Sequence, residues 1–283
     1  MDRRRLAMKP ECVWPVEAML GEGPLWVPRD QALWFVDIKK QHIHRYDPAS
    51  GARRSFDAPQ SPGFLCSDGD GFVVGLTDGL YRFDPRDGSF ALLHLVDADK
   101  PGNRLNDGAR DAAGRIWFGT MDNGETAPTG CLYRLDAGGP VAVEHGICIT
   151  NGPCSSPDGK IFYHTDTLKR TIYAYDLGAD GTLSNKRIFT EIEADAGYPD
   201  GSVIDAEGCL WLGLYAGWAA RRYDDRGKLM STVRFPCANI TKLAFAGTTV
   251  YATTAWKGLD AKARAEQPLA GGLFRFESDV AGL

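Results

Sequence analysis

Four short motifs recur along this chain at the same point of a repeating pattern, and each joins a carboxylate or carboxamide to a glycine. They are Gly21-Glu22-Gly23-Pro24, Asn106-Asp107-Gly108, Asn151-Gly152-Pro153 and Pro199-Asp200-Gly201. Each motif leads into a short strand, a turn, and a strand with Trp or Phe: Leu33-Trp34-Phe35, Ile116-Trp117-Phe118, Ile161-Phe162-Tyr163 and Leu210-Trp211-Leu212. Such a period is typical of a protein built from similar units, in which equivalent residues occupy equivalent places.

A second marker gives the number and the length of the units. Each unit ends in a strand of alternating apolar and polar residues before an acidic turn: Ile43-His44-Arg45-Tyr46-Asp47, Leu80-Tyr81-Arg82-Phe83-Asp84, Leu132-Tyr133-Arg134-Leu135-Asp136, Ile172-Tyr173-Ala174-Tyr175-Asp176, Arg221-Arg222-Tyr223-Asp224 and Leu273-Phe274-Arg275-Phe276-Glu277. The spacing gives about six units of roughly 45 residues, the length of a four-stranded propeller blade. Alternation with a period of two indicates strands, and no long stretch has the period of a helix. The sequence therefore predicts an all-β fold, a six-bladed β-propeller of four-stranded blades.

Two units depart from the motif, and the ring also needs a closure. The second unit has Gly63-Phe64-Leu65 in place of the polar motif, and the sixth has Asn239-Ile240-Thr241-Lys242 without a carboxylate. Two sheet edges stay open unless the first and last units are joined. Residues 11–16 belong to no unit, so we expect an N-terminal strand that completes the last blade. Residues 1–10 are basic and lack an apolar run, which predicts a flexible tail before a single domain at 11–283.

Composition narrows the range of partners. The net charge is −5 and basic residues are dispersed among acidic ones, which argues against nucleic acid as a partner. No apolar stretch has the length that crosses a membrane, and no apolar core follows Arg3-Arg4-Arg5 as it would in a signal peptide. The seven cysteines are scattered without a Cys-x-x-Cys pair, which argues against a disulfide framework and a thiolate zinc site. We expect a cytoplasmic protein and, as is common for closed propellers, a monomer.

The four motifs point to a metal site. In a propeller, residues at the start of the inner strands surround one mouth of the channel, and Glu22, Asn106, Asn151 and Asp200 fall there. A single Asn-Gly or Asp-Gly is ordinarily a turn, but four in register predict oxygens that converge as a hard divalent cation requires. Glu22 and Asp200 match its charge and Asn151 adds a neutral oxygen, which leaves positions for water and substrate. Such donors are compatible with calcium, magnesium, manganese, iron(II) or zinc.

Arg104, two residues before Asn106, is the next candidate for the site. At the channel mouth its planar guanidinium is suited to hold two oxygens of a polyol or a carboxylate. The alternative is a surface arginine paired with an acid. Asp107 is a candidate for orienting its neighbours from outside the ligand set. His164 is expected to be structural, because a general base needs suitable geometry as well as a suitable pKa.

Taken together, these motifs resemble one known family. The sequence is similar to the SMP-30/gluconolactonase/regucalcin family over nearly its whole length, from Gly21-Glu22-Gly23-Pro24 to Ala270-Gly271-Gly272-Leu273-Phe274. Within this family it looks most like bacterial sugar-acid lactonases of the xylonolactonase, or pentonolactonase, type. The most specific stretches are Ile149-Thr150-Asn151-Gly152-Pro153, Phe162-Tyr163-His164-Thr165-Asp166-Thr167 and Tyr198-Pro199-Asp200-Gly201-Ser202.

The resemblance implies a six-bladed propeller with one divalent metal ion in its channel. It implies that Glu22, Asn151 and Asp200 are the metal ligands, and that Asp200 also acts as the catalytic acid and base. It further implies that Arg104 and Asn106 contact the sugar lactone.

One feature of the family is displaced in this chain. Many relatives carry a further substrate-binding glutamate shortly after the Gly-Thr-Met of the third blade. Here Gly119-Thr120-Met121 is followed by Asp122-Asn123-Gly124-Glu125, so Glu125 is the candidate substitute and Asp122 competes with it.

The expected reaction is the metal-dependent hydrolysis of a sugar lactone, such as xylonolactone, to the open-chain aldonic acid. A metal ion polarises the lactone carbonyl and stabilises the oxyanion, while water attacks the carbonyl carbon. One alternative is another metal-dependent hydrolase on the same scaffold, such as a phosphotriesterase, although Arg104 and Asn106 favour a hydroxyl-rich substrate. A second alternative is a non-enzymatic calcium-binding propeller, which predicts a protein partner and no turnover.

Overall fold

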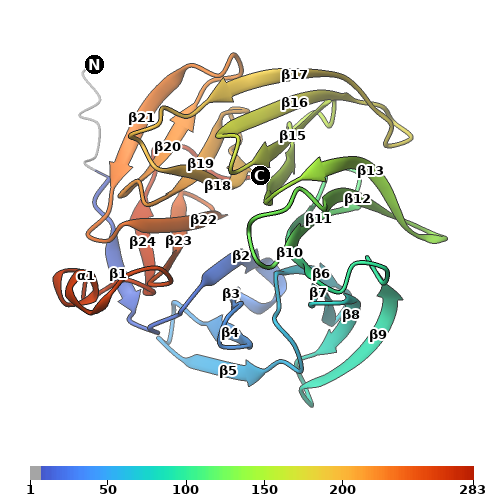
Figure 1. The fold of residues 1–283 in the computed structure, drawn as a ribbon. Coiled ribbons are helices and arrows are strands. Elements are labelled where there is room, and N and C mark those ends of the chain that lie inside the picture. Colours follow the sequence, from blue (N-terminus) through green and yellow to red (C-terminus); the bar gives the residue numbers. More distant parts are fainter. Residues whose placement is uncertain (1–7) are drawn as a thin grey trace.

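The computed structural model describes residues 8–283, which form six antiparallel four-stranded sheets arranged as the blades of a ring (Figure 1). Blade one contains β2 (Gly21–Val27), β3 (Ala32–Asp37), β4 (His42–Tyr46) and β5 (Arg53–Asp57). Blade two contains β6 (Phe64–Asp68), β7 (Gly71–Gly75), β8 (Gly79–Asp84) and β9 (Ser89–Leu95). Blade three contains β10 (Asn103–Arg110), β11 (Ile116–Asp122), β12 (Gly130–Asp136) and β13 (Gly139–Ile147).

The remaining blades follow the same order, with the first strand nearest the centre of the ring (Figure 1). Blade four contains β14 (Thr150–Ser155), β15 (Ile161–Asp166), β16 (Thr171–Leu177) and β17 (Leu183–Glu191). Blade five contains β18 (Tyr198–Ile204), β19 (Leu210–Tyr215), β20 (Ala219–Tyr223) and β21 (Leu229–Arg234). Blade six contains β22 (Asn239–Ala246), β23 (Thr249–Ala255), β24 (Leu273–Glu277) and β1 (Glu11–Trp14). The predicted six-bladed propeller is therefore confirmed.

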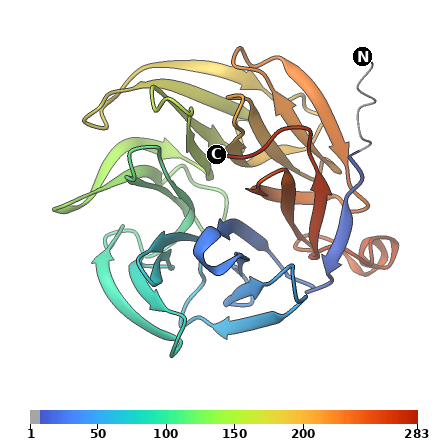
Figure 2. The ribbon, with the colours of Figure 1, turned by 180° about the vertical axis from the view of Figure 1, so that it is seen from behind.

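The N-terminal strand closes the ring, as predicted. β1 pairs antiparallel with β24, with Glu11 opposite Arg275, so the first described strand becomes the outer edge of the last blade. Figure 2 shows β1 lying beside the red strands of blade six. Most of the predicted tail lies outside the described residues, and Met8 packs against the apolar cluster that blades five and six share.

The second sequence marker was assigned to the wrong place in the unit. The alternating strands before acidic turns were expected to end each unit, but they are the third strands β4, β8, β12, β16, β20 and β24. In blades one to five a fourth, outer strand follows them. Those outer strands have a weak apolar pattern because they are largely exposed: β9, for example, has no fully buried residue.

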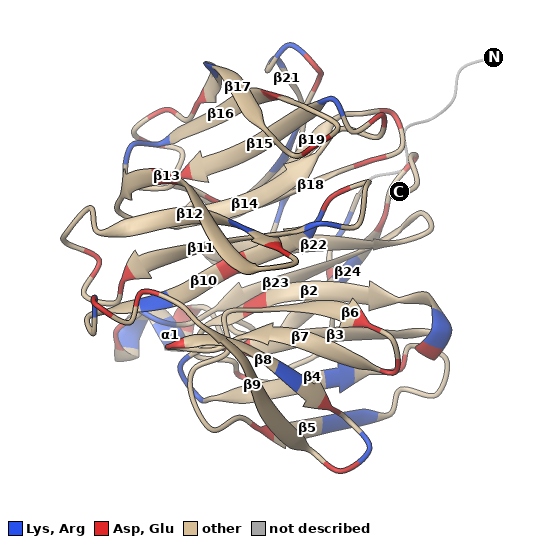
Figure 3. Ribbon diagram, turned by 90° about the vertical axis from the view of Figure 1, so that its right-hand side faces the viewer, with Lys and Arg blue, Asp and Glu red and all other residues tan. Residues whose placement is uncertain are grey.

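Apolar side chains fill the space between neighbouring blades, so the blades stabilise one another. Trp34 of blade one lies 4.7 Å from Phe72 of blade two, measured between ring centroids. Trp117 of blade three lies 4.5 Å from Phe162 of blade four. Aromatic pairs at such distances add to the free energy of burial. In Figure 3 the strands are mostly uncharged, while residues of both charges gather at strand ends and in loops.

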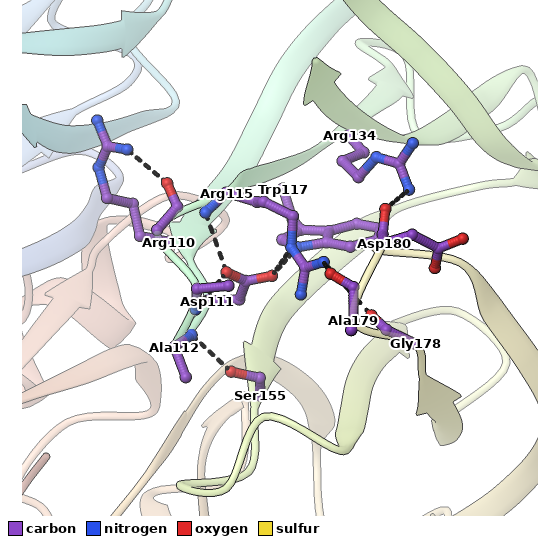
Figure 4. Close-up of polar contacts among 12 residues, drawn as sticks. Arg110, Asp111, Ala112, Arg115, Trp117, Arg134, Ser155, Gly178, Ala179 and Asp180 are labelled. Atoms are coloured by element: carbon purple, nitrogen blue, oxygen red, sulfur yellow. Dashed lines mark hydrogen bonds and ion pairs between the residues drawn. The ribbon is translucent and has the colours of Figure 1, made fainter. Parts of the chain in front are cut away.

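An aspartate, buried in blades three and five and half-buried in blade one, anchors the tryptophan of the second strand. In blade three the Asp111 carboxylate accepts hydrogen bonds from Trp117 Nε1 at 2.8 Å and from Arg115 Nε at 2.6 Å (Figure 4). Asp205 of blade five accepts from Trp211 Nε1 at 2.8 Å, and Asp30 of blade one accepts from Trp34 Nε1 at 3.2 Å. These repeats are structural, because each carboxylate serves the turn and the indole of its own blade.

Helices contribute little to the fold. Residues 8–283 contain the short helix α1 (Ala261–Glu266), capped by Asp260 at its N-terminus, and a 3-10 turn at Pro28–Asp30. No helix in this part of the chain is long and apolar enough to span a membrane.

Candidate active site

The inner strands of five blades contain a β-bulge at the position of the sequence motifs. In blade one, Glu22 pairs with Val36 and Leu25 with Trp34, so two residues of β2 lie opposite the single residue Phe35. The same two-against-one arrangement occurs in β10, β14, β18 and β22. A bulge interrupts the strict alternation of a strand and re-aims side chains. Neighbouring residues of one strand can therefore both contribute to the channel.

The bulges correct the assumption that the four motifs occupy equivalent positions. Glu22 and Asn151 are the last paired residues before their bulges, whereas Asp200 and Asn106 are the first residues inside theirs. The side-chain oxygens of these four residues thus reach the same part of the channel from two successive positions relative to the bulge. The shared glycine had suggested that the four motifs occupy the same position of the repeat. This was misleading, because the bulge tolerates glycine at more than one of its positions.

Blade two differs from the others in this respect. β6 pairs regularly with β7 from Phe64 to Asp68, without a bulge. The side chain of Phe64 is fully buried, and it belongs to the apolar cluster between blades two and three. The unit whose sequence lacked a polar motif is therefore the one whose inner strand is regular.

Six of the residues selected from the sequence line one cavity of about 370 Å³ at the mouth of the channel, while Asp107 and Asp122 do not. The six are Glu22, Arg104, Asn106, Glu125, Asn151 and Asp200. The apolar part of the wall includes Leu20, Met121 and Ile149, while Tyr198, Tyr215, Thr167 and Lys257 add polar groups. A cavity with an apolar wall and a few convergent polar groups is typical of a small-molecule site.

A chain of hydrogen bonds fixes the amide of Asn151. Arg104 Nη1 donates to Asn106 Oδ1 at 2.6 Å, and Asn106 Nδ2 donates to Asn151 Oδ1 at 3.0 Å. Asn151 Nδ2 in turn donates to Thr167 Oγ1 at 2.9 Å. This network orients the Asn151 carbonyl oxygen, which keeps a second lone pair for another partner. Asn106 therefore lines the cavity and also positions Asn151.

Glu22 and Asp200 are buried carboxylates with few hydrogen-bond donors. Glu22 Oε2 accepts only from the backbone N–H of Gly23, at 3.0 Å, and no donor among residues 8–283 contacts the Asp200 carboxylate. Burial, followed by the charge of Asp107, raises the pKa of Glu22 to about 8. Burial and the charge of Glu22 raise the pKa of Asp200 well above its ordinary value. Among the described residues, no basic group forms an ion pair with either carboxylate, so the nearby positive charges compensate them only in part.

This donor set fits a divalent cation. Two carboxylates and one amide oxygen line the same cavity, and a bound cation would relieve the repulsion between the carboxylates. Among the described residues no group of three His, Cys, Asp or Glu side chains is arranged to hold a metal ion. Glu22, Asn151 and Asp200 differ from such a group because their third member is an amide.

The structure separates the two candidates on the third-blade loop. Asp122 accepts hydrogen bonds from the backbone N–H groups of Gly124, Thr126 and Ala127, so its carboxylate holds the loop together. Glu125 lines the cavity and forms an ion pair with Lys257 of the loop after β23. Glu125 is therefore better placed to meet a ligand.

Several positively charged groups lie at the rim of the cavity. Arg104 is buried, and burial lowers the pKa of its guanidinium to about 10. Arg104 Nε and Lys39 Nζ both donate to Asn123 Oδ1, at 3.2 and 3.0 Å. Arg104 is thus no surface arginine paired with an acid, which was the alternative from the sequence.

Other cavity residues did not stand out in the sequence. Tyr198, Tyr215 and Lys257 reach the cavity from strand ends and loops, where no spacing marks them. Lys242 does not line this cavity, but it had a signal in the sequence, because a lysine in an apolar inner strand is unusual. His164 lies opposite the bulge of blade four and does not line the cavity, and burial lowers its pKa to about 4.

Comparisons with known proteins agree with this arrangement. Residues 20–256 match the sequence model of the family described as SMP-30/Gluconolactonase/LRE-like region. Regucalcin from Oryctolagus cuniculus is 37% identical over 95% of this chain and 94% of its own length. A protein from Pseudomonas putida named 6-deoxy-6-sulfogluconolactonase is 31% identical over 96% of both chains.

A solved structure extends the likeness to three dimensions. The structure of a calcium-binding protein, regucalcin, from Agrobacterium tumefaciens superposes with a TM-score of 0.93 and 29% identity. The match covers 98% of this chain and 96% of that protein. With its six blades, its closing strand and its polar inner-strand motifs, this chain belongs to the SMP-30/gluconolactonase/regucalcin family.

Proposed function

We propose that this protein is a divalent-metal-dependent lactonase that hydrolyses a sugar lactone to the open-chain aldonic acid. The observation that carries the proposal is the pair of unsatisfied buried carboxylates, Glu22 and Asp200, beside Asn151 in a cavity of about 370 Å³. The Pseudomonas putida relative, whose name describes a lactonase for a modified gluconolactone, supports the substrate class.

Glu22, Asn151 and Asp200 are the residues that would hold the metal ion. When bound, the ion would supply Lewis-acid polarisation of the lactone carbonyl. The network through Asn106 and Thr167 would keep the Asn151 carbonyl oxygen directed at the site, so that little reorganisation accompanies binding.

Asp200 is proposed as the acid and base of the reaction. Its carboxylate, free of other donors, would accept a proton from the water that attacks the carbonyl carbon. The tetrahedral species then loses the ring oxygen, and the proton held on Asp200 passes to that oxygen to complete the ring-opened hydroxyl.

Arg104 and Glu125 are proposed to bind the lactone hydroxyls. The guanidinium offers several N–H donors, and the Glu125 carboxylate, held by Lys257, offers acceptors in the same cavity. A polyol with hydroxyls on neighbouring carbons matches this combination better than an apolar phosphotriester does. We infer a pentonolactone such as xylonolactone as the substrate, and we expect a monomer in the cytoplasm.

The test is acid release from a xylonolactone by metal-loaded protein, repeated after EDTA treatment and desalting. We expect the rate to fall to the spontaneous level after chelation and to recover with added divalent metal, while circular dichroism stays that of a β protein. Full activity of verified metal-free protein would refute the mechanism. Parallel assays with iron(II), zinc, manganese, calcium and magnesium would identify the effective ion.

A calcium-binding role without catalysis is the second candidate. It is favoured by the all-oxygen ligand set and by the calcium-binding relative from Agrobacterium tumefaciens. This role predicts tight calcium binding and no lactone turnover with any metal of the series. The same assays therefore separate the two candidates.

A further inference from the structure

Lys242 forms a bridge across the channel beside the proposed metal site. It is the second residue of the β22 bulge in blade six, and its Nζ lies 2.6 Å from Asp107 Oδ1. Asp107 is the second bulge residue of β10 in blade three, on the opposite side of the six-bladed ring (Figure 1). Lys242 is only 6% exposed and Asp107 only 2%. The two equivalent positions therefore meet as a buried ion pair.

The surrounding backbone is shaped to hold this pair. A Cβ added at Gly201 would lie 2.5 Å from Lys242 Cγ, so the lysine stem can pass only because blade five has a glycine there. The backbone N–H of Gly108 donates to Asp107 Oδ1 at 2.8 Å, and that of Gly152 donates to Asp107 Oδ2 at 2.9 Å. With the ammonium of Lys242, three donors occupy the Asp107 carboxylate.

The charge of Lys242 also acts on two carboxylates of the proposed site, Glu22 and Asp200. The charge of Asp107 acts on both Glu22 and Asp200 and raises the pKa of each. Lys242 opposes this effect at both carboxylates, with help from Arg104 at Glu22 and from Lys257 at Asp200. The centre of the channel therefore contains three buried carboxylates and one buried ammonium.

We propose that Lys242 is a positioning residue that keeps Asp107 out of the metal-ligand set and thereby limits the affinity of the site for its cation. A hard cation is bound more tightly as the number of negatively charged ligands increases. With Asp107 engaged by Lys242, the site presents two carboxylates in place of three. This inference rests on the proposed metal site, but it does not depend on the reaction that the site performs.

The test measures divalent-metal affinity by isothermal titration calorimetry of metal-free protein with Mn²⁺ and with Ca²⁺. Lys242→Met removes the ammonium and frees a carboxylate, so we expect the Kd to fall at least tenfold. Asp107→Asn leaves the ammonium without its partner near the cation, so we expect the Kd to rise at least tenfold. The double variant should return to within about threefold of the wild type, because the two charge changes cancel.

The opposite signs distinguish positioning from a merely structural role. If the bridge only stabilises the fold, both single variants bind metal more weakly, and that result overturns the inference. Lys40→Met is the matched control, because it removes an exposed lysine whose Nζ contacts the Glu17 carbonyl, and its Kd should not change. If Lys242→Met does not fold, Lys242→Gln replaces it, since it also removes the ammonium, and a Kd that is unchanged or higher in this variant contradicts the proposal.

Failure of the inference and failure of the proposed function give different results. The calorimetric titration measures metal binding without a substrate. If the Kd changes as predicted but the protein hydrolyses no lactone, only the proposed lactonase activity is refuted. Metal-dependent hydrolysis combined with unchanged Kd values in both single variants would refute only the role of Lys242.

Discussion

Asp205 in blade five and Asp200 five residues earlier in the same blade are both buried, yet their environments are opposite. The Asp205 carboxylate accepts from Trp211 Nε1, from Arg222 Nε and from the backbone N–H groups of Glu207 and Cys209. Asp200 accepts from no donor among the described residues. Buried polar groups are normally paired, so an unpaired one requires an explanation. Asp200 thus differs from Asp205 in its unmet hydrogen-bonding capacity and not in its burial.

The largest expected effect is on catalysis by Asp200→Asn. This change keeps the size of the side chain and one ligand oxygen, but it removes a negative charge and the proposed base. We expect kcat to fall about 10²–10⁴-fold, the usual range for loss of a general base, and metal affinity to fall modestly. Bound metal and kcat should be measured together at saturating metal. If Asp200→Asn has near wild-type turnover at saturating metal, Asp200 is a ligand only and not the base.

The next effect is on stability, from Asp205→Ala. This change leaves the buried Trp211 indole and two backbone N–H groups without their acceptor and removes one of the two acids that pair with the half-buried Arg222, which costs on the order of 3–5 kcal/mol in free energy of unfolding. Chemical denaturation should reveal the loss, while kcat per folded molecule stays near wild type. Glu207→Ala is the matched control, because Glu207 pairs with the same arginine at the surface. Its cost should be about 0–1 kcal/mol. Equal costs would contradict the distinction between the two aspartates.

A smaller effect is expected from Arg104→Ala. The loss of a charge-assisted hydrogen bond to the substrate costs about 1.5–3 kcal/mol, or about ten- to a hundredfold in kcat/KM, mostly through KM. Metal content should not change, because Arg104 reaches the ligand Asn151 only through Asn106. Arg110→Ala provides the control, since Arg110 lies on the same strand and contacts the Gly114 carbonyl instead. A kcat/KM equal to that of the control would remove Arg104 from the site.

The smallest effect concerns the metal-free protein and its pH dependence. The pKa of Glu22 is raised to about 8, so the folded state holds a proton that the unfolded chain has already released above about pH 4.3. This difference destabilises the fold progressively from about pH 4 up to pH 8, and it disappears below that window. Glu22→Gln should therefore raise the melting temperature by several degrees at pH 8 and by almost nothing at pH 4. If Glu22→Gln changes the melting temperature by the same amount at both pH values, Glu22 is ionised in the folded protein throughout this range.

Much of the fold could be predicted because its signals are local. Strand alternation and repeated turns lie within each unit of the sequence, and they identified the six blades and the closing strand β1. The outer strands were missed because exposed strands lose their apolar pattern, as β9 shows. For the same reason, the third strands were mistaken for the ends of the units.

The site was predictable in part. Glu22, Asn106, Asn151 and Asp200 could be found from their glycine-containing motifs, and the structure brings them to one cavity. The choice of Glu125 over Asp122 required the loop conformation, in which Asp122 is occupied by backbone N–H groups. Lys257 could not be found, because its partner Glu125 lies 132 residues away in the sequence.

By itself, the sequence determined the number of blades, the closing strand and the polar residues of the inner strands, because these follow from periodic patterns within each unit. Only the tertiary structure decided which inner-strand residues face the channel. Five β-bulges shift the register by one residue, and no spacing rule anticipates them. The tertiary structure alone also joined Asp107 to Lys242, 135 residues apart. Such contacts arise when the ring closes and brings opposite blades together, so their physical cause lies in the packing of the whole chain.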